Sequence, residues 1–210
     1  AVCNVCHDNP KHRDFAINSN ILEQVCCAMD EHRGKDGGDK VHETGCMALR
    51  NIGSTPQGQG AVGPRGLKAI TDGVEHYFET PGIIKSSMGV LCNLCVLGSN
   101  GKSFIETGKL KLWTKIYDDA VNQYPIRLGC AAMIHNLASK QESCVLLAVN
   151  DDGLGLIIGK ILKDAPHDSA LFGNTLKGLA ALMYTLPPNK QLKIEAMTKM
   201  LDNGVLDIFN

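Results

Sequence analysis

The sequence predicts an all-α protein built from internal repeats of 42–47 residues. An asparagine followed by an aliphatic residue recurs at Asn4, Asn51, Asn93 and Asn136, with gaps of 47, 42 and 43 residues. Downstream of each asparagine, a glycine or asparagine separates a short apolar stretch from an amphipathic run. No convincing alternation of polar and apolar residues predicts a strand. These observations together favour helical units that repeat along the whole chain.

The recurring asparagines lie in segments with the apolar spacing of buried helices, as in "LCNLCVLGSN", where Ile84, Met88, Leu91 and Cys95 follow a helical period. Asparagine is unfavourable inside a helix, because its amide competes for backbone hydrogen bonds. Its return to one position therefore indicates a packing or binding role. A fifth equivalent position, 45 residues after Asn136, holds Ala181.

The second landmark falls at Asn20, Gly66, Gly108, Gly153 and Gly204. We expect these residues to end a short helix with positive φ, and a new helix to follow directly. Two Gly-rich stretches are predicted to be connectors. Residues 32–40 suggest a flexible insertion, and residues 53–66 are expected to replace or shorten the first helix of their unit. Residues 184–191 predict a turn.

The period, the glycine before an aliphatic helix start in "ETGKLKLW" and the asparagine in "IHNLAS" resemble the armadillo repeat. The resemblance covers residues 1–210 in about five units: 1–40, 41–81, 82–125, 126–169 and 170–210. It implies one domain, a right-handed superhelical α-solenoid. HEAT repeats share the period, but the glycine hinge and the asparagine favour armadillo. Because a repeat cannot bury its faces alone, we expect further repeats or a partner subunit to cover the ends.

Composition limits the other functions. The formal net charge is −1, so the chain lacks the basic excess that nucleic acid or an anionic membrane surface requires. No apolar run approaches the ~20 residues of a membrane span. The nine cysteines lie mostly in apolar helical patterns and are predicted to be reduced, which implies the cytosol or the nucleus.

We expect no catalysis and no cofactor. "GSNGKS" at residues 98–103 has Val96 where a phosphate-binding loop needs glycine and follows a helical segment, so a polar inter-helix loop is predicted. "HRD" at residues 12–14 lacks the other kinase signatures. "NDDG" at residues 150–153 lacks a calcium loop's ligands and predicts a helix-capping turn. The seven histidines form no pattern with nucleophiles or carboxylates.

The armadillo resemblance implies that the third helix of each unit lines a concave groove, and that its asparagine bonds the backbone of an extended peptide. This role is assigned to Asn4, Asn51, Asn93 and Asn136, since a carboxamide offers one acceptor and two donors. Arg50 and His135 directly precede two of these asparagines and are assigned as partner contacts, although partial burial between helices is the alternative. Ala181 cannot make such bonds.

One alternative to peptide binding remains open. The asparagines could bond adjacent helix turns, in which case the protein is a scaffold that docks through its termini and convex face. Importin-α-type armadillo proteins place tryptophan four residues before the asparagine, whereas this chain has Met47, Gly89 and Ala132, so we do not expect it to bind nuclear-import signals. The third helices also lack the Lys/Arg array of catenin-type binders.

The pairs Cys3/Cys6 and Cys92/Cys95 have a zinc-ligand spacing but occupy the same offsets from Asn4 and Asn93, so repetition explains them. Two units of packed helices, at roughly 10 Å each, would also separate the pairs too far for one ion. We therefore predict that the purified protein carries no stoichiometric zinc. Elemental analysis measures this directly, and about one zinc per chain would contradict it.

Overall fold

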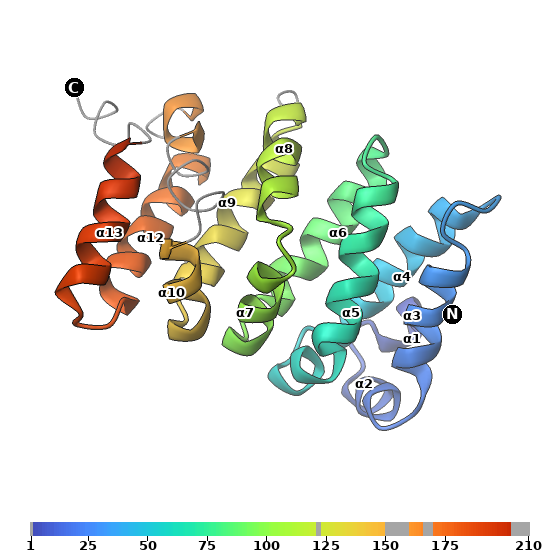
Figure 1. Cartoon of the computed structure of the whole chain (residues 1–210). Coiled ribbons are helices and arrows are strands. Elements are labelled where there is room, and N and C mark those ends of the chain that lie inside the picture. Colours follow the sequence, from blue (N-terminus) through green and yellow to red (C-terminus); the bar gives the residue numbers. More distant parts are fainter. Residues whose placement is uncertain (1, 121–122, 150–159, 166–169, 203–210) are drawn as a thin grey trace. The chain divides into compact units, whose positions relative to one another are not determined.

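The computed structural model describes residues 2–120, 123–149, 160–165 and 170–202, with the backbone alone for residues 3, 5 and 149 (Figure 1). Within these ranges the regular structure is α-helical, and no strand is found. The chain divides into two compact units, residues 1–100 and 101–210. Each unit has its own core.

Unit 1 contains three third helices of the repeat, with first and second helices between them. The third helices are α1 (Val2–Cys6), α4 (Gly38–Ile52) and α6 (Pro81–Leu94); between them lie α2 (Pro10–Ile17), α3 (Ile21–Glu31) and α5 (Pro56–His76). In Figure 1, α3 and α5 lie in front of α4 and α6. The third helices therefore lie on the opposite face of unit 1 from α3 and α5.

Caps and prolines fix where the first helices begin. The Asn9 side chain accepts a hydrogen bond from the His12 N–H (3.2 Å) at the start of α2, and Thr55 accepts one from the Gly58 N–H (3.2 Å) at the start of α5. A proline follows each cap at the first helical position, where its missing N–H costs nothing. The pairs Asn9–Pro10 and Thr55–Pro56 thus mark the starts of α2 and α5.

The expectation that residues 53–66 form a connector was wrong. Residues 56–76 are helical and are interrupted only at Gly63 (φ 45°, ψ −154°), with Pro64 opening the second segment. The hinge thus falls three residues before Gly66, at a position where positive φ favours glycine. The cap at Thr55 and packing of α5 against α3 and α6 outweigh the poor helix propensity of this stretch.

The other turn predictions had mixed outcomes. Gly108 has the expected positive φ (70°), but Asn20 does not (−75°). Residues 98–103 are not a loop but begin α7 (Gly98–Glu106), where the buried Asn100 amide donates to the carbonyl oxygens of Gln59 (2.8 Å) and Leu94 (3.3 Å). The turn within residues 184–191 is confirmed. Gly153, Gly204 and residues 150–153 lie outside the described residues.

Residues 32–37 form a turn that is tied to the second helix of the next repeat. The Gly34 N–H donates to the Tyr77 hydroxyl (3.0 Å), and α4 begins directly afterwards at Gly38. Within the Gly-rich stretch 32–40, residues 32–37 are therefore non-helical and residues 38–40 belong to α4. The hydrogen bond to the Tyr77 hydroxyl holds the backbone of the turn.

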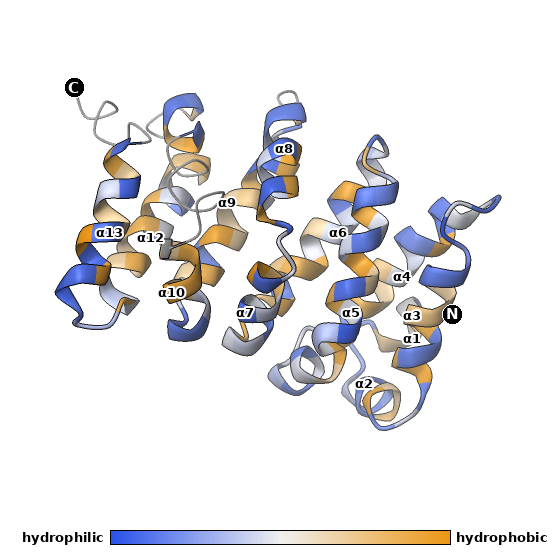
Figure 2. Ribbon diagram, in the orientation of Figure 1, coloured by the Kyte–Doolittle hydropathy of each residue, from blue (hydrophilic) through white to orange (hydrophobic). Residues whose placement is uncertain are grey.

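The core of unit 1 lies between its two helical faces. The apolar sides of α4, α5 and α6 face one another (Figure 2). Among the largest fully buried side chains there, each at most 1% exposed, are Leu49, Ile52, Leu67, Ile70, Leu91 and Leu94. Helices α4 and α5 approach closely at Gly73. A Cβ atom at Gly73 would lie 1.7 Å from Cε1 of His42, so only glycine fits there.

Unit 2 is likewise built from helices of the repeat. Its helices are α8 (Leu110–Asp119), α9 (Tyr124–Ala138), α10 (Gln141–Val149), α12 (Ala170–Thr185) and α13 (Lys190–Asp202), with further helical residues at 160–164. The third helices α9 and α12 pack against each other. Trp113 and Phe104 are buried with ring centroids 5.9 Å apart, and the Arg127 guanidinium lies 4.1 Å from the centroid of the buried Tyr117 ring.

We predict that Gly73→Ala destabilises the protein, because the added methyl group would collide with the His42 ring and force α4 and α5 apart. Overpacking of this kind costs about 1–3 kcal/mol. Gly60→Ala is the matched control, since Gly60 lies in the same helix and a Cβ there would meet only Leu97, at 4.0 Å. The control should gain about 0.5–1 kcal/mol from helix propensity. Urea unfolding measures both, and equal stability of the two variants would contradict the packing argument.

Candidate functional site

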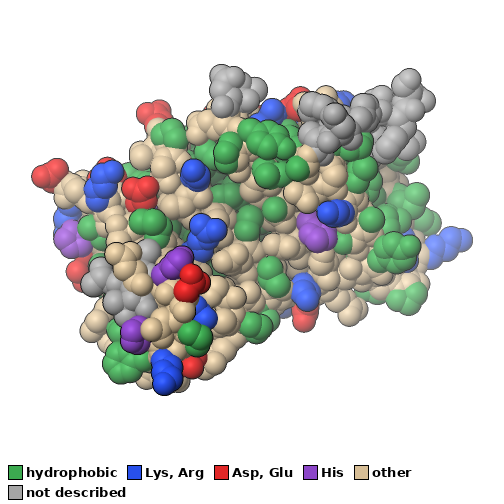
Figure 3. All heavy atoms as spheres, turned by 180° about the vertical axis from the view of Figure 1, so that it is seen from behind, with side chains coloured by type: hydrophobic (Ala, Val, Ile, Leu, Met, Phe, Trp, Pro, Cys, Tyr) green, Lys and Arg blue, Asp and Glu red, His purple; other side chains and the backbone are tan. Residues whose placement is uncertain are grey.

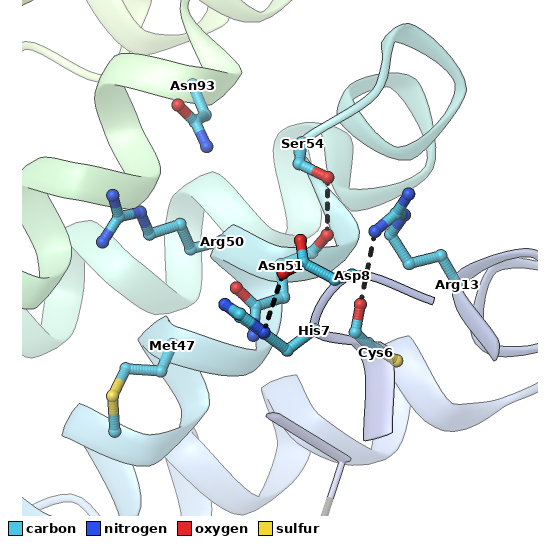
Figure 4. A pocket seen from close by; sticks show the side chains of 9 residues that line it. All are labelled: Cys6, His7, Asp8, Arg13, Met47, Arg50, Asn51, Ser54 and Asn93. Atoms are coloured by element: carbon cyan, nitrogen blue, oxygen red, sulfur yellow. Dashed lines mark hydrogen bonds and ion pairs between the residues drawn. The ribbon is translucent and has the colours of Figure 1, made fainter. Parts of the chain in front are cut away.

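A pocket of about 430 Å³ opens in unit 1 between the third helices α4 and α6 and the turn that follows α1 (Figure 4). It is lined by Cys6, His7, Asp8, Arg13, Met47, Arg50, Asn51, Ser54 and Asn93. Figure 3 views the side on which α4 and α6 lie; basic, acidic and histidine side chains gather on its unit 1 part. The pocket therefore combines charged groups with carboxamides from two consecutive repeats.

Asn51 and Asn93 occupy equivalent places, each as the penultimate residue of its helix. This corrects the expectation of a mid-helix position, because in the last turn an amide competes less with the helical backbone. The Ser54 hydroxyl donates to the Asn51 carbonyl oxygen (2.9 Å), which satisfies one of the free carbonyls at the end of α4. Both asparagine side chains are half-buried and line the same pocket (Figure 4).

Arg50 lies beside Asn51 on α4 and is exposed. Its side chain lies along the backbone of α6 at Gly89: a Cβ atom there would meet the arginine Nε at 3.4 Å and Cζ at 3.5 Å. No hydrogen bond or ion pair to Arg50 occurs among the residues that the structure describes. The predicted alternative for this position, partial burial between helices, does not hold for Arg50.

The other side of the pocket is formed by the turn after α1. Arg13 Nη1 donates to the Cys6 carbonyl oxygen (3.4 Å), while its Nε is buried and has no hydrogen-bond partner in the described part of the chain. His7 Nδ1 lies 3.4 Å from the carboxylate of Asp8, and both side chains are well exposed, at 68% and 90%. Asp8 has φ of 51°, a conformation that aspartate tolerates better than most residues.

The remaining predicted site residues lie elsewhere. Asn4 is exposed on α1 but does not line the pocket. Asn136 and His135 belong to α9 of unit 2 and are half-buried. At His135, α9 packs closely on α12, since a Cβ at Gly178 would lie 3.4 Å from the His135 Cα. The structure thus brings together Arg50, Asn51 and Asn93 of the predicted set.

Sequence reasoning missed several lining residues. His7 and Ser54 stand three residues after Asn4 and Asn51, so the repeat alignment contained a signal for this position. Arg13 had no such signal. Its equivalents in the next two repeats are Gly60 and Lys102, so the arginine itself does not recur there.

A buried cysteine and histidine lie behind the pocket, within the core. Cys46 Sγ lies 3.6 Å from His42 Nε2 and 3.4 Å from Ser87 Oγ, and all three side chains are completely buried. Burial raises the pKa of Cys46 to about 12 and lowers the pKa of His42 to about 4. Both groups are therefore neutral near pH 7, and the thiol is not a thiolate nucleophile.

Three further findings concern the described residues as a whole. No group of three or more His, Cys, Asp or Glu side chains is placed to hold a metal ion. No described helix combines the length and apolar character that crossing a bilayer demands. The cysteines whose side chains are described are all free thiols, and most of them are buried.

Comparison with known proteins identifies the fold class. No family model and no curated protein matches the sequence. Among solved structures, a designed armadillo repeat protein in complex with the peptide (KR)4 has a TM-score of 0.77 and 18% identity, covering 99% of this chain and 80% of that one. Two engineered proteins have TM-scores of 0.74 and 0.75 at 18% and 16% identity, covering 99% of this chain and 79% and 77% of theirs. The predicted class, an all-α armadillo-like repeat fold, is confirmed.

The burial of His42 predicts a pH dependence of stability. Its folded-state pKa of about 4 lies below the ordinary value of 6.5, so the unfolded chain binds more protons between these values. The stabilisation is complete above pH 6.5 and is lost as the pH falls through 4, by up to about 3 kcal/mol. His42→Gln should flatten this slope in urea unfolding measured from pH 7 to 4. The exposed His32→Gln should leave it unchanged, and equal slopes in both variants would contradict the assignment.

Proposed function

We propose that the protein is a noncatalytic module that binds an extended segment of a protein partner along the third helices, with Asn51 and Asn93 holding the peptide backbone. One observation carries the proposal: two carboxamides at equivalent positions of consecutive third helices line the same pocket. Each amide can accept from a peptide N–H and donate to a peptide C=O. Asn4 and Asn136 extend this role by repeat equivalence.

The spacing suits an extended ligand. Packed helices lie roughly 8–10 Å apart, and an extended peptide advances about 3.3 Å per residue. Asparagines on neighbouring third helices would therefore form hydrogen bonds with the peptide backbone at about every third residue. The peptide side chains between these points would contact other residues of the pocket. The designed armadillo protein whose fold this chain shares was solved with a bound peptide, which supports a peptide as the ligand.

A second candidate function is a scaffold within a larger protein assembly. Unit 1 has an apolar hollow of about 390 Å³ between α1, α3 and α4, lined largely by Val2, Val25, Ala28, Val41 and Ala48. In unit 2, α13 exposes Ile194, Met197 and Leu201, each to nearly half of its surface. Exposed apolar surfaces of this kind favour contact with other proteins. Either function suits a reducing compartment, the cytosol or the nucleus, because the described cysteines are free thiols.

The peptide-binding function predicts that the double variant Asn51→Ala/Asn93→Ala binds its peptide at least about ten-fold more weakly. It would lose two to four hydrogen bonds of roughly 0.5–1.5 kcal/mol each. Peptides selected from a randomised display library against the full chain serve as ligands, and isothermal titration calorimetry gives their affinities. Asn20→Ala is the control, since it truncates an exposed asparagine of the same unit outside the pocket.

Thermal unfolding of the same variants separates the two candidate functions. If the asparagines grip a ligand, the double variant should unfold close to the temperature of the wild type, because alanine is the better helix former. Unchanged affinity together with a large loss of stability would make the asparagines structural. In that case, Ile194→Gln/Met197→Gln should weaken association with the partner and leave the pocket intact.

A further inference from the structure

We infer that the pocket of unit 1 selects an acidic side chain, an aspartate or glutamate of the bound peptide, and that Arg50 is the residue that recognises its carboxylate. This inference rests on the proposed function and adds the chemical class of the ligand. It is carried by the charges that line the pocket and by the hydrogen-bonding state of the two arginines there.

Arg50 is positioned as a specificity residue. It directly precedes Asn51, so a peptide whose backbone is held by Asn51 brings a side chain within reach of the guanidinium. The guanidinium makes no hydrogen bond or ion pair with a described residue, although the other three arginines of unit 1 all do. Its planar set of N–H donors matches a carboxylate in a bidentate geometry.

The orientation of Arg50 depends on a glycine. Its side chain extends along α6 over Gly89, where atoms beyond a Cβ would occupy the space that the guanidinium fills. The space over Gly89 thus accommodates an arginine from the preceding repeat.

The rest of the lining reinforces the positive potential. Arg13 contributes a second guanidinium, and its buried Nε lacks a partner within the described residues. The one carboxylate of the lining, Asp8, is adjacent to the His7 imidazole. A carboxylate of a ligand would therefore meet an opposite charge at either arginine, whereas a lysine or arginine of a ligand would meet a like one.

The experiment uses three labelled octapeptides: (DE)4, its neutral isostere (NQ)4, and (KR)4, the peptide bound by the designed armadillo protein. The full chain is titrated against each at low and at high salt and followed by fluorescence anisotropy. We expect (DE)4 to bind at least about ten-fold more tightly than (NQ)4, with a difference that shrinks at high salt. We expect (KR)4 to bind more weakly than (NQ)4.

Variants test the residue assignment. Arg50→Gln should remove most of the preference for (DE)4 without changing the affinity for (NQ)4. Gly89→Leu should act in the same direction while keeping every charge, because it displaces the Arg50 side chain. Asp8→Asn should tighten (DE)4 binding. Lys35→Gln is the control for net charge, since it removes an exposed cation of unit 1 that does not line the pocket.

The outcomes distinguish this inference from the proposed function. If (NQ)4 or (KR)4 binds as tightly as (DE)4, or if Arg50→Gln and Lys35→Gln have the same effect, the inference is wrong. The proposed function still stands in that case, provided that Asn51→Ala/Asn93→Ala weakens all bound peptides alike. If no peptide binds, or binding is independent of both asparagines, the proposed function and the inference fail together.

Discussion

The packing of α4 into the core of unit 1 is the constraint on which the rest of this unit depends. One side of the helix is buried at His42, Gly45, Cys46, Leu49 and Ile52, which recur with helical spacing. The opposite side carries Met47, Arg50 and Asn51, and Ser54 follows just after the helix. Burial of the first set therefore fixes the rotation of the helix about its axis, and with it the direction in which the pocket residues point.

The same burial explains why Cys46 and His42 do not form an ionised nucleophile–base pair. Cys46 and His42 lie within hydrogen-bonding distance, an arrangement that would make a nucleophile in an exposed, electropositive setting. Here desolvation raises the pKa of Cys46 and lowers the pKa of His42, so both side chains are neutral near pH 7. Arg50, one turn further along, is exposed. Position on the helix decides whether a polar group on α4 is buried in the core or lines the pocket.

Much of this arrangement could be predicted from the sequence, because repetition amplifies weak signals. The repeat positions of the asparagines and the helical class follow from periodicity. The prediction failed where a contact distant in sequence decides the local structure. Gly-rich residues 56–62 are helical because α5 packs on its neighbours, and α7 begins at Gly98 because buried carbonyl groups accept from Asn100. The equivalent of Arg13 in the next repeat is Gly60, so comparison of these two repeats does not identify the arginine in the pocket.

Under the proposed function, the asparagine of each third helix and the residue before it have different roles in peptide binding. The asparagine supplies the same backbone contact in each third helix and carries no preference for a peptide sequence. The residue before it differs between repeats: Arg50 is exposed and charged, whereas Cys92 and His135 are half-buried. A peptide held by equivalent amides would thus meet a different side chain in each repeat. Selectivity can change by substitution at this one position, while the core-facing side of the helix, and therefore the fold, stays the same.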